Sequence, residues 1–247
     1  DVAWMSNLKL RAGWGMVGND RITNYLSLNV YDPYKYGVGE QQVIVYHPAH
    51  IANKNLKWEA AATANIGIDA GFCDNRLNVT LDAFVKDSKD LLLAQDLTYV
   101  TGFESQVQNV GQLRNEGIEL SLSSINFDRR NFSWKTDFNI SFIRNTLVSL
   151  QSGTDYMLSK SGIATSYSSY DYIAQVGHPI GSMYGYVFDG VYQTSDFEYH
   201  ADGTRHLRPG VTDISEHAGK EIFPGFVKYK DMTGDGKITD ADRTMIG

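Results

Sequence analysis

The most regular feature of the sequence is an alternation of apolar and polar residues with a period of two. It is longest in residues 58–70, where every second position is apolar: Trp58, Ala60, Ala62, Ala64, Ile66, Ile68 and Ala70. A helix would bring apolar residues together at spacings of three and four, so this pattern predicts a β-strand. The predicted strand exceeds the about five to six residues that are usual in soluble domains.

Four other segments alternate in the same way, at residues 8–16, 77–86, 118–123 and 132–142. One side of the predicted strands carries the apolar residues Val79, Leu81, Ile118, Leu120, Phe138 and Ile140. The other side carries the polar residues Thr80, Asp82, Glu119, Asp137 and Asn139. We therefore expect an all-β chain whose strands present one apolar and one polar face.

The connections between the predicted strands alternate between short and long. Residues 73–76 and 128–131 are tight turns, whereas residues 18–56, residues 92–112 and the stretch after Leu147 are long. An outer-membrane β-barrel accounts for this alternation, because its periplasmic turns are short and its extracellular loops are long. Its apolar face would meet lipid, and its wide lumen would hydrate the charged residues that a small closed barrel buries unfavourably. An antiparallel sheet with one face in water alternates similarly and remains an alternative.

Composition and charge exclude several other classes of protein. The net charge of −7 argues against a nucleic-acid partner, which requires a basic surface. No apolar run approaches the about 18 residues of a membrane-spanning helix, and the single cysteine, Cys73, excludes an intramolecular disulfide. Because the chain opens at Asp1 without a methionine or an apolar leader, we expect a mature, processed or partial sequence.

The sequence contains no recognisable catalytic site. Phosphate-binding loops, the nucleophile elbow and the zinc-protease motif do not occur, and the carboxylates form no evident acid/base pair. We therefore do not expect an enzyme. The long connections are rich in Tyr, Ser, Gly and Asp, as in residues 161–172, a composition that suits sugar or peptide binding but also ordinary exposed turns.

Residues 231–242, "DMTGDGKITDAD", are spaced like a calcium-binding loop. The pattern assigns the ligands to the side chains of Asp231, Thr233, Asp235 and Asp242, the backbone carbonyl of Lys237, and a water at Thr239. Thr233 replaces the usual Asp or Asn, and Asp242 is shorter than the usual glutamate, as in dockerin-type loops. The alternative is a turn whose carboxylates cap backbone amides. Both Ca²⁺ binding and a purely structural turn remain open from the sequence.

Six ordered stretches resemble the SusC/RagA family of TonB-dependent outer-membrane nutrient importers of Bacteroidetes. They are "LKLRAGWGMVGND", "NKNLKWEAAATANIGIDAGFCDNRLNVTLDAFVKDSKDLLL", "NVGQLRNEGIELSLSS", "FSWKTDFNISFIRN", "PIGSMYGYVFDGVYQ" and "GFVKYKDMTGDGKITDADRTMIG". The resemblance covers most of residues 1–247 and places them in the C-terminal barrel region of the family.

The resemblance implies a large antiparallel transmembrane β-barrel of 22 strands in the bacterial outer membrane, with long extracellular loops. It further implies an N-terminal plug that contacts TonB, a SusD-like surface lipoprotein as partner, and a glycan or peptide as substrate. We expect the plug and the closing strands to be absent from this sequence, and residues 231–242 to lie in an extracellular-side loop. The alternative function is that of a soluble extracellular all-β binding module with a dockerin-like calcium loop.

Overall fold

The computed structural model describes residues 4–20, 22–103, 105–150, 153–159 and 170–246. The chain divides into two compact units, the first formed by Asp1–Asp155 with Val176–Pro179 and the second by Tyr156–Gln175 with Ile180–Gly247. Most of the Tyr- and Ser-rich segment 161–172 lies outside the described residues. Among those residues, no helix is long and apolar enough to cross a membrane.

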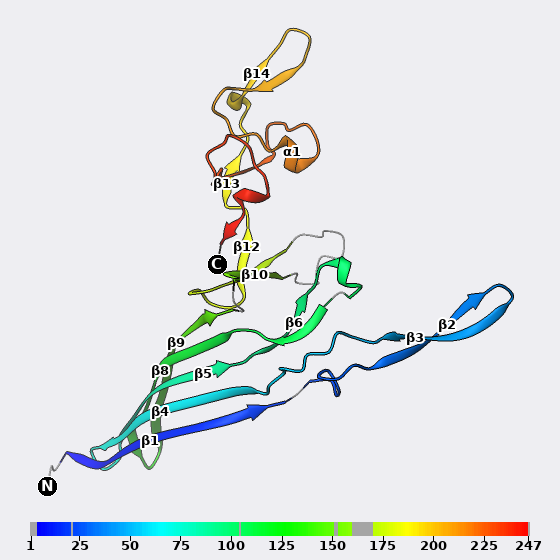
Figure 1. Ribbon diagram of the computed structural model, residues 1–247. Helices are drawn as coiled ribbons and strands as arrows, with labels where there is room; N and C mark the ends of the chain where they lie inside the picture. The colour runs from blue at the N-terminus through cyan, green and yellow to red at the C-terminus, as the bar shows by residue number, and fades with distance from the viewer. Residues whose placement is uncertain (1–3, 21, 104, 151–152, 160–169, 247) are drawn as a thin grey trace. The chain divides into compact units, whose positions relative to one another are not determined.

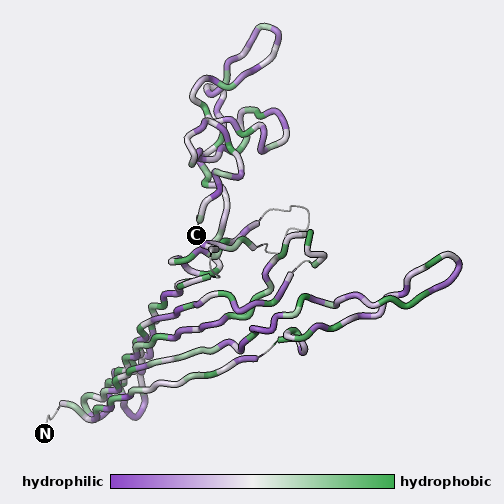
Figure 2. The backbone as a smooth tube through the Cα atoms, viewed as in Figure 1, coloured by the Kyte–Doolittle hydropathy of each residue, from purple (hydrophilic) through white to green (hydrophobic). Residues whose placement is uncertain are grey.

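The first unit is built on a five-stranded antiparallel sheet in the order β1-β4-β5-β8-β9 (Figure 1). Its strands are β1 (Met5–Asn19), β4 (Glu59–Phe72), β5 (Leu77–Lys89), β8 (Gln112–Arg129) and β9 (Phe132–Ser149). All five strands that the period-two pattern predicts are therefore confirmed, and each extends beyond the predicted segment or matches it within a residue. Figure 2 shows hydrophobic and hydrophilic positions succeeding each other along these strands.

The short turns join strands at one end of the sheet. Cys73, Asp74 and Asn75 all have a positive φ in the β4–β5 turn, a conformation that Asn and Asp tolerate better than most residues. The predicted turn at 128–131 is wrong by two residues, because Asp128 and Arg129 pair with Ser133 and Phe132 and extend β8. Only Arg130 and Asn131 remain in that turn.

The long connections of the first unit contain strands that the sequence pattern did not reveal. Residues 20–58 include the hairpin of β2 (Tyr31–Val38) and β3 (Gln41–Pro48), which reverses direction at Gly39 with a φ of 62°. Residues 90–111 include β6 (Leu92–Asp96), a 3₁₀ turn at Tyr99–Thr101 and β7 (Ser105–Asn109). The expectation of long connections is confirmed, but each carries a two-stranded sheet of its own.

The second unit consists of short elements around a small core. Its four-stranded sheet comprises β10 (Tyr156–Ser159), β11 (Tyr172–Gln175), β12 (Ser182–Gly185) and β17 (Thr244–Met245). Two further strand pairs are β13 (Phe188–Val191) with β16 (Val227–Tyr229) and β14 (Phe197–Tyr199) with β15 (Arg205–Leu207). A short helix, α1 (Ser215–Ala218), and 3₁₀ turns at Thr194–Asp196 and Asp240–Asp242 complete it. The core is formed by Tyr192, Phe197, Ile214, Ile222 and Ile238.

Candidate functional site

The register of the five-stranded sheet aligns apolar residues from every strand on one face. The central row runs through Leu10, Ile68, Leu81, Leu120 and Ile140, each directly opposite the next. The rows on either side contain Leu8, Ala70, Val79, Leu122 and Phe138, and Ala12, Ile66, Ala83, Ile118 and Phe142. The six residues predicted to share the apolar face therefore do so.

This apolar face is not covered by another layer of the described chain. Leu10 is 72% exposed, Ile118 53% and Phe142 67%. A contiguous apolar surface of this extent is unfavourable in water and marks an interaction with a partner or with membrane. Lipid covers such a face in a transmembrane barrel.

Aromatic residues mark both ends of the apolar face. At the short-turn end, Trp4 stacks on Phe72 with ring centroids 5.5 Å apart, and Phe127 stacks on Trp134 at 5.9 Å. Towards the other end lies Trp14, which pairs with Ala64. From residue 64 to residue 72 a strand covers about 26 Å, at about 3.3 Å per residue. A tilt of about 35–45° reduces this height to about 20 Å, close to the apolar band of about 25 Å in membrane barrels.

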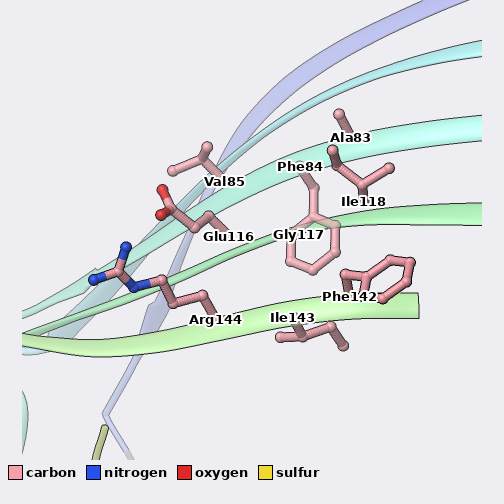
Figure 3. Close-up of a pocket in the computed structure, with 9 residues that line it drawn as sticks. All are labelled: Ala83, Phe84, Val85, Glu116, Gly117, Ile118, Phe142, Ile143 and Arg144. Atoms are coloured by element: carbon pink, nitrogen blue, oxygen red, sulfur yellow. The ribbon is translucent and has the colours of Figure 1, made fainter. Parts of the chain in front are cut away.

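A pocket lies where the apolar face ends, and Phe84, Gly117 and Ile143 of its lining form a cross-strand row on the opposite face (Figure 3). It has a volume of about 470 Å³, and its residues come from three adjacent strands: Ala83, Phe84, Val85, Glu116, Gly117, Ile118, Phe142, Ile143 and Arg144. Val85, Glu116 and Arg144 are aligned in one cross-strand row. In the next row on that face, Arg114 donates to the Asp87 carboxylate from Nε at 2.8 Å and from Nη2 at 2.9 Å. The apolar face thus gives way to charged residues towards the long connections.

Gly117 allows the Phe84 ring to lie against the backbone of β8 at this point (Figure 3). A Cβ at residue 117 would come within 3.0 Å of that ring and 2.8 Å of the Phe142 carbonyl oxygen. Glycine inside a strand often marks such a close approach.

The opposite face of the sheet carries a network of charged side chains. Arg11 donates from Nε to Asp69 Oδ2 at 2.8 Å and from Nη2 to Asp82 Oδ2 at 3.0 Å, so one guanidinium joins three strands. Thr80 Oγ1 donates to Asp69 Oδ1 at 3.1 Å. A Cβ at Gly67 would meet the Asp82 carboxylate and come within 2.7 Å of Arg11 Nη2, so the guanidinium requires glycine beneath it.

The polar residues predicted from the sequence share this charged face. Asp82 lies opposite Glu119, Thr80 opposite Ser121, and Ser121 opposite Asn139. Asp137 lies opposite Ser123 in the adjacent row. A face with this density of charge is suited to a wide, hydrated lumen.

In the calcium-like segment of the second unit, Asp242 is the central hydrogen-bond acceptor. Its side chain is fully buried, Oδ1 accepts from the amides of Met232 and Thr233 at 3.0 and 3.1 Å, and Oδ2 accepts from the Thr239 amide at 2.8 Å. These amides stabilise the charged carboxylate and lower its pKa to about 2. Asp231 accepts from the amides of Gly234 and Gly236, which also lowers its pKa.

The remaining residues of the segment have different surroundings. Asp235 Oδ1 accepts from the amide of Lys237 at 2.8 Å, and Lys237 Nζ lies 3.9 Å from Glu216. Thr239 caps the 3₁₀ turn by accepting from Ala241. Ile238 is fully buried in the core and anchors the segment. The structure thus brings Asp231, Thr233 and Asp242 together through hydrogen bonds, with Asp235 bonded separately.

Metal binding at this segment stays a prediction. Within the part of the chain that the structure describes, no three or more His, Cys, Asp or Glu side chains are grouped so as to hold a metal ion. The carboxylates of Asp231 and Asp242 already accept several hydrogen bonds each. Thr and backbone ligands would have to complete any calcium site.

The sheet has long antiparallel strands, an exposed apolar face with aromatic residues at both ends, and a charged opposite face. These features define a wall segment of a transmembrane β-barrel. The family model described as "TonB dependent receptor-like, beta-barrel" matches residues 2–225, so the chain belongs to this family. Such receptors are transporters of the bacterial outer membrane and not enzymes. The alternative of a soluble extracellular binding module is therefore set aside.

Individual relatives agree with the SusC/RagA resemblance. The chain is 36% identical to TonB-dependent receptor P3 of Formosa agariphila over 97% of its length and 22% of that receptor. It is 32% identical to TonB-dependent receptor SusC of Bacteroides thetaiotaomicron over 75% of its length and 19% of that receptor. A structure of the RagAB peptide transporter matches with a TM-score of 0.68 and 25% identity, covering 83% of this chain and 23% of that one. The chain thus spans about a fifth to a quarter of these relatives.

Proposed function

We propose that the protein imports oligosaccharides or peptides across the outer membrane in a TonB-dependent manner. The observation that carries this proposal is the two-faced sheet of the first unit, with Leu10, Leu81 and Ile140 on the lipid side and the Arg11 network on the lumen side. A wide lumen lined by charged and polar residues is suited to a hydrophilic solute. The peptide transporter among the structural relatives supports peptides as one substrate class.

We further propose that the full protein carries a plug that contacts TonB, and works with a SusD-like surface lipoprotein. The long connections at residues 18–56 and 147–185, and the loop 231–242, would lie on the extracellular side. The hairpin of β2 and β3 supports a partner there, because two strands alone are marginally stable in water. Its residues Tyr34 and Tyr36 are 58% and 56% exposed, as expected of a surface that another protein covers.

The proposal is tested by growth of a strain that lacks the transporter gene on defined nutrients. We expect growth on an oligosaccharide or a peptide mixture to be lost and to be restored by the intact gene. The same gene should fail to restore growth in a strain without TonB. Normal growth of the deletion strain on every oligosaccharide and peptide mixture tested, with uptake rates unchanged, would overturn the import function.

A further inference from the structure

The short-turn end of β8 and β9 places an arginine on the apolar face of the sheet. Side chains alternate along β9, so Trp134 and Phe132 share the face of Phe138, which they precede by four and six residues. In β8, Phe127 lies opposite Trp134, and Arg129 lies opposite Phe132. Arg129 therefore lies on the apolar face, beyond the stacked rings of Phe127 and Trp134.

A β-bulge at Asn126 produces this arrangement. The pairing of β8 with β9 shifts between Ile125 and Phe127, so β8 has one residue more than β9 at this point. Phe127 and Arg129 follow Leu122 by five and seven residues, and a regular strand would place both on the charged face. The extra residue returns them to the apolar face, and bulges commonly re-aim side chains in this way.

Hydrogen bonds on two sides hold the bulge in place. Asn126 Nδ2 donates to Thr136 Oγ1 at 2.7 Å, and Ser124 Oγ donates to Asn126 Oδ1 at 3.1 Å. The Ile125 amide donates to the Arg76 carbonyl at 2.8 Å, and Arg76 Nη2 donates to the Asn126 carbonyl at 3.3 Å. The bulge is thus joined both to β9 and to the β4–β5 turn, so the backbone that carries Arg129 has a defined position.

The residues at this end of the apolar face follow the order of the layers in a lipid leaflet. After the last apolar row come hydroxyl and amide groups, then the stacked Phe127 and Trp134, and then Arg129. Aromatic residues gather at the level of the lipid headgroups, so an arginine beside them meets the phosphates. Asp128 lies on the other face. Within the described residues Arg129 and Arg130 are exposed and form no ion pair, so their charge is available to an external anion.

We propose that Arg129 binds the phosphate of an anionic phospholipid in the periplasmic leaflet of the outer membrane. A guanidinium donates two parallel hydrogen bonds to a phosphate, and basic side chains at a membrane surface attract anionic lipids. The acyl chains of the same lipid would continue over the apolar face, which a free phosphate ion could not use. The choice of leaflet rests on the proposed orientation, in which the short turns face the periplasm.

The test uses the full-length transporter, purified from outer membranes in mild detergent and stripped of lipid. The probes are dioleoylphosphatidylglycerol, dioleoylphosphatidylcholine and inorganic phosphate, and native mass spectrometry gives the dissociation constant of each lipid. We expect phosphatidylglycerol to bind more tightly than phosphatidylcholine and to withstand competition by inorganic phosphate. Arg129→Gln should lower the affinity for phosphatidylglycerol about fivefold, the effect of one arginine at an anionic surface, and leave that for phosphatidylcholine unchanged.

Two further variants separate the position of the arginine from its charge. Lys135 lies opposite Ile125 on the charged face, at the same end of the sheet. Lys135→Gln removes the same charge as Arg129→Gln and should leave the affinity for phosphatidylglycerol unchanged. Arg129→Lys should retain most of the affinity, because lysine also binds phosphate as a point charge. The unfolding temperature without added lipid should be equal in all three variants.

Three results would overturn the inference: unchanged affinity for phosphatidylglycerol in Arg129→Gln, an equal loss in Lys135→Gln, or an equal loss of affinity for phosphatidylcholine. Displacement of the lipid by inorganic phosphate would also overturn it, because the site would then recognise the ion alone. Nutrient uptake by cells that carry Arg129→Gln measures the import function separately, and normal uptake leaves that function standing whichever result is obtained.

Discussion

At the scale of single residues, the charged face of the sheet depends on glycine as much as on charge. Arg11 reaches Asp69 on β4 and Asp82 on β5 only because Gly67 leaves the space between them empty. Gly15 lies on the same face of β1, yet a Cβ there would meet no heavy atom within 4 Å. The two glycines therefore form a matched pair with opposite expectations.

Gly67→Ala should destabilise the full-length barrel by about 1–2 kcal/mol, because the new methyl group displaces Arg11 from its carboxylates. Gly15→Ala should be neutral, since its methyl group enters open space. Tryptophan fluorescence during unfolding in urea, with the protein in lipid vesicles, measures both. Equal effects of the two substitutions would show that the open space at Gly67 does not position Arg11.

Asp242 leads to a prediction about pH. Its pKa falls from 3.8 to about 2 in the folded protein because backbone amides stabilise the carboxylate. A lowered folded pKa means that this stabilisation is complete above pH 3.8 and is lost as the pH falls through about 2. Amide hydrogen exchange of peptides from residues 225–246, corrected for the intrinsic rate, should show this loss of protection between about pH 4 and pH 2.

Asp242→Asn should remove much of the same protection at neutral pH without added calcium. The control is Asp235→Ala, since Asp235 accepts a single backbone amide, that of Lys237. If millimolar calcium increased the protection in the wild-type protein but not in Asp235→Ala, the segment would bind the ion. Full protection in Asp242→Asn would show that the hydrogen bonds of this carboxylate do not hold the segment.

At the scale of elements, the five long strands were predictable because their apolar face is continuous. A strand with one face against lipid needs an apolar residue at every second position, so its sequence alone predicts it, as residues 58–70 show. The hairpin of β2 and β3 was missed because both its faces are exposed and its alternation is weak. The sequence features that could have predicted this hairpin are its Tyr- and Val-rich strands and Gly39 at the turn between them.

Contacts between distant strands were the part of the site that the sequence did not reveal. Arg11, Asp69 and Asp82 each lie at a predicted polar position, but their meeting depends on the register of three strands. Side-chain hydrogen bonds place residues 51–57 beside β7, and no periodic pattern specifies that placement. The sequence shows the calcium-like spacing. It does not show that Asp242 is buried and accepts hydrogen bonds from backbone amides.

The assignment of strand residues to the apolar or the polar face of the sheet gives a testable prediction. Leu120 and Ser121 are neighbours in β8 on opposite faces, and Leu120 lies in the central apolar row. Leu120→Arg should destabilise the barrel by about 2–4 kcal/mol, the effect of arginine at the bilayer midplane, whereas Ser121→Arg should have a much smaller effect. Urea unfolding in lipid vesicles measures both, and a larger effect at Ser121 would reverse the assigned faces.

At the scale of the whole molecule, this chain supplies one stretch of wall and the loops attached to it. The five-stranded sheet has β1 and β9 at its edges, and a barrel must continue from such edges to close. The chain spans about a fifth to a quarter of its relatives' length. In the proposed complex, the surface of the long connections would meet the partner.

The hairpin of β2 and β3 gives the sharpest prediction about assembly. Tyr34 lies opposite Val45 and Tyr36 opposite Val43, so all four side chains share one exposed face, whereas Lys35 and Ile44 lie on the other. Aromatic residues on such a face supply rigid contact area for a partner. A Tyr34→Ser and Tyr36→Ser double variant should therefore lower recovery of the SusD-like lipoprotein with the transporter at least tenfold, about 1.4 kcal/mol or more. Lys35→Ser should leave recovery unchanged. Barrel yield must stay constant across the variants, and undiminished recovery with the double variant would place the lipoprotein contact elsewhere.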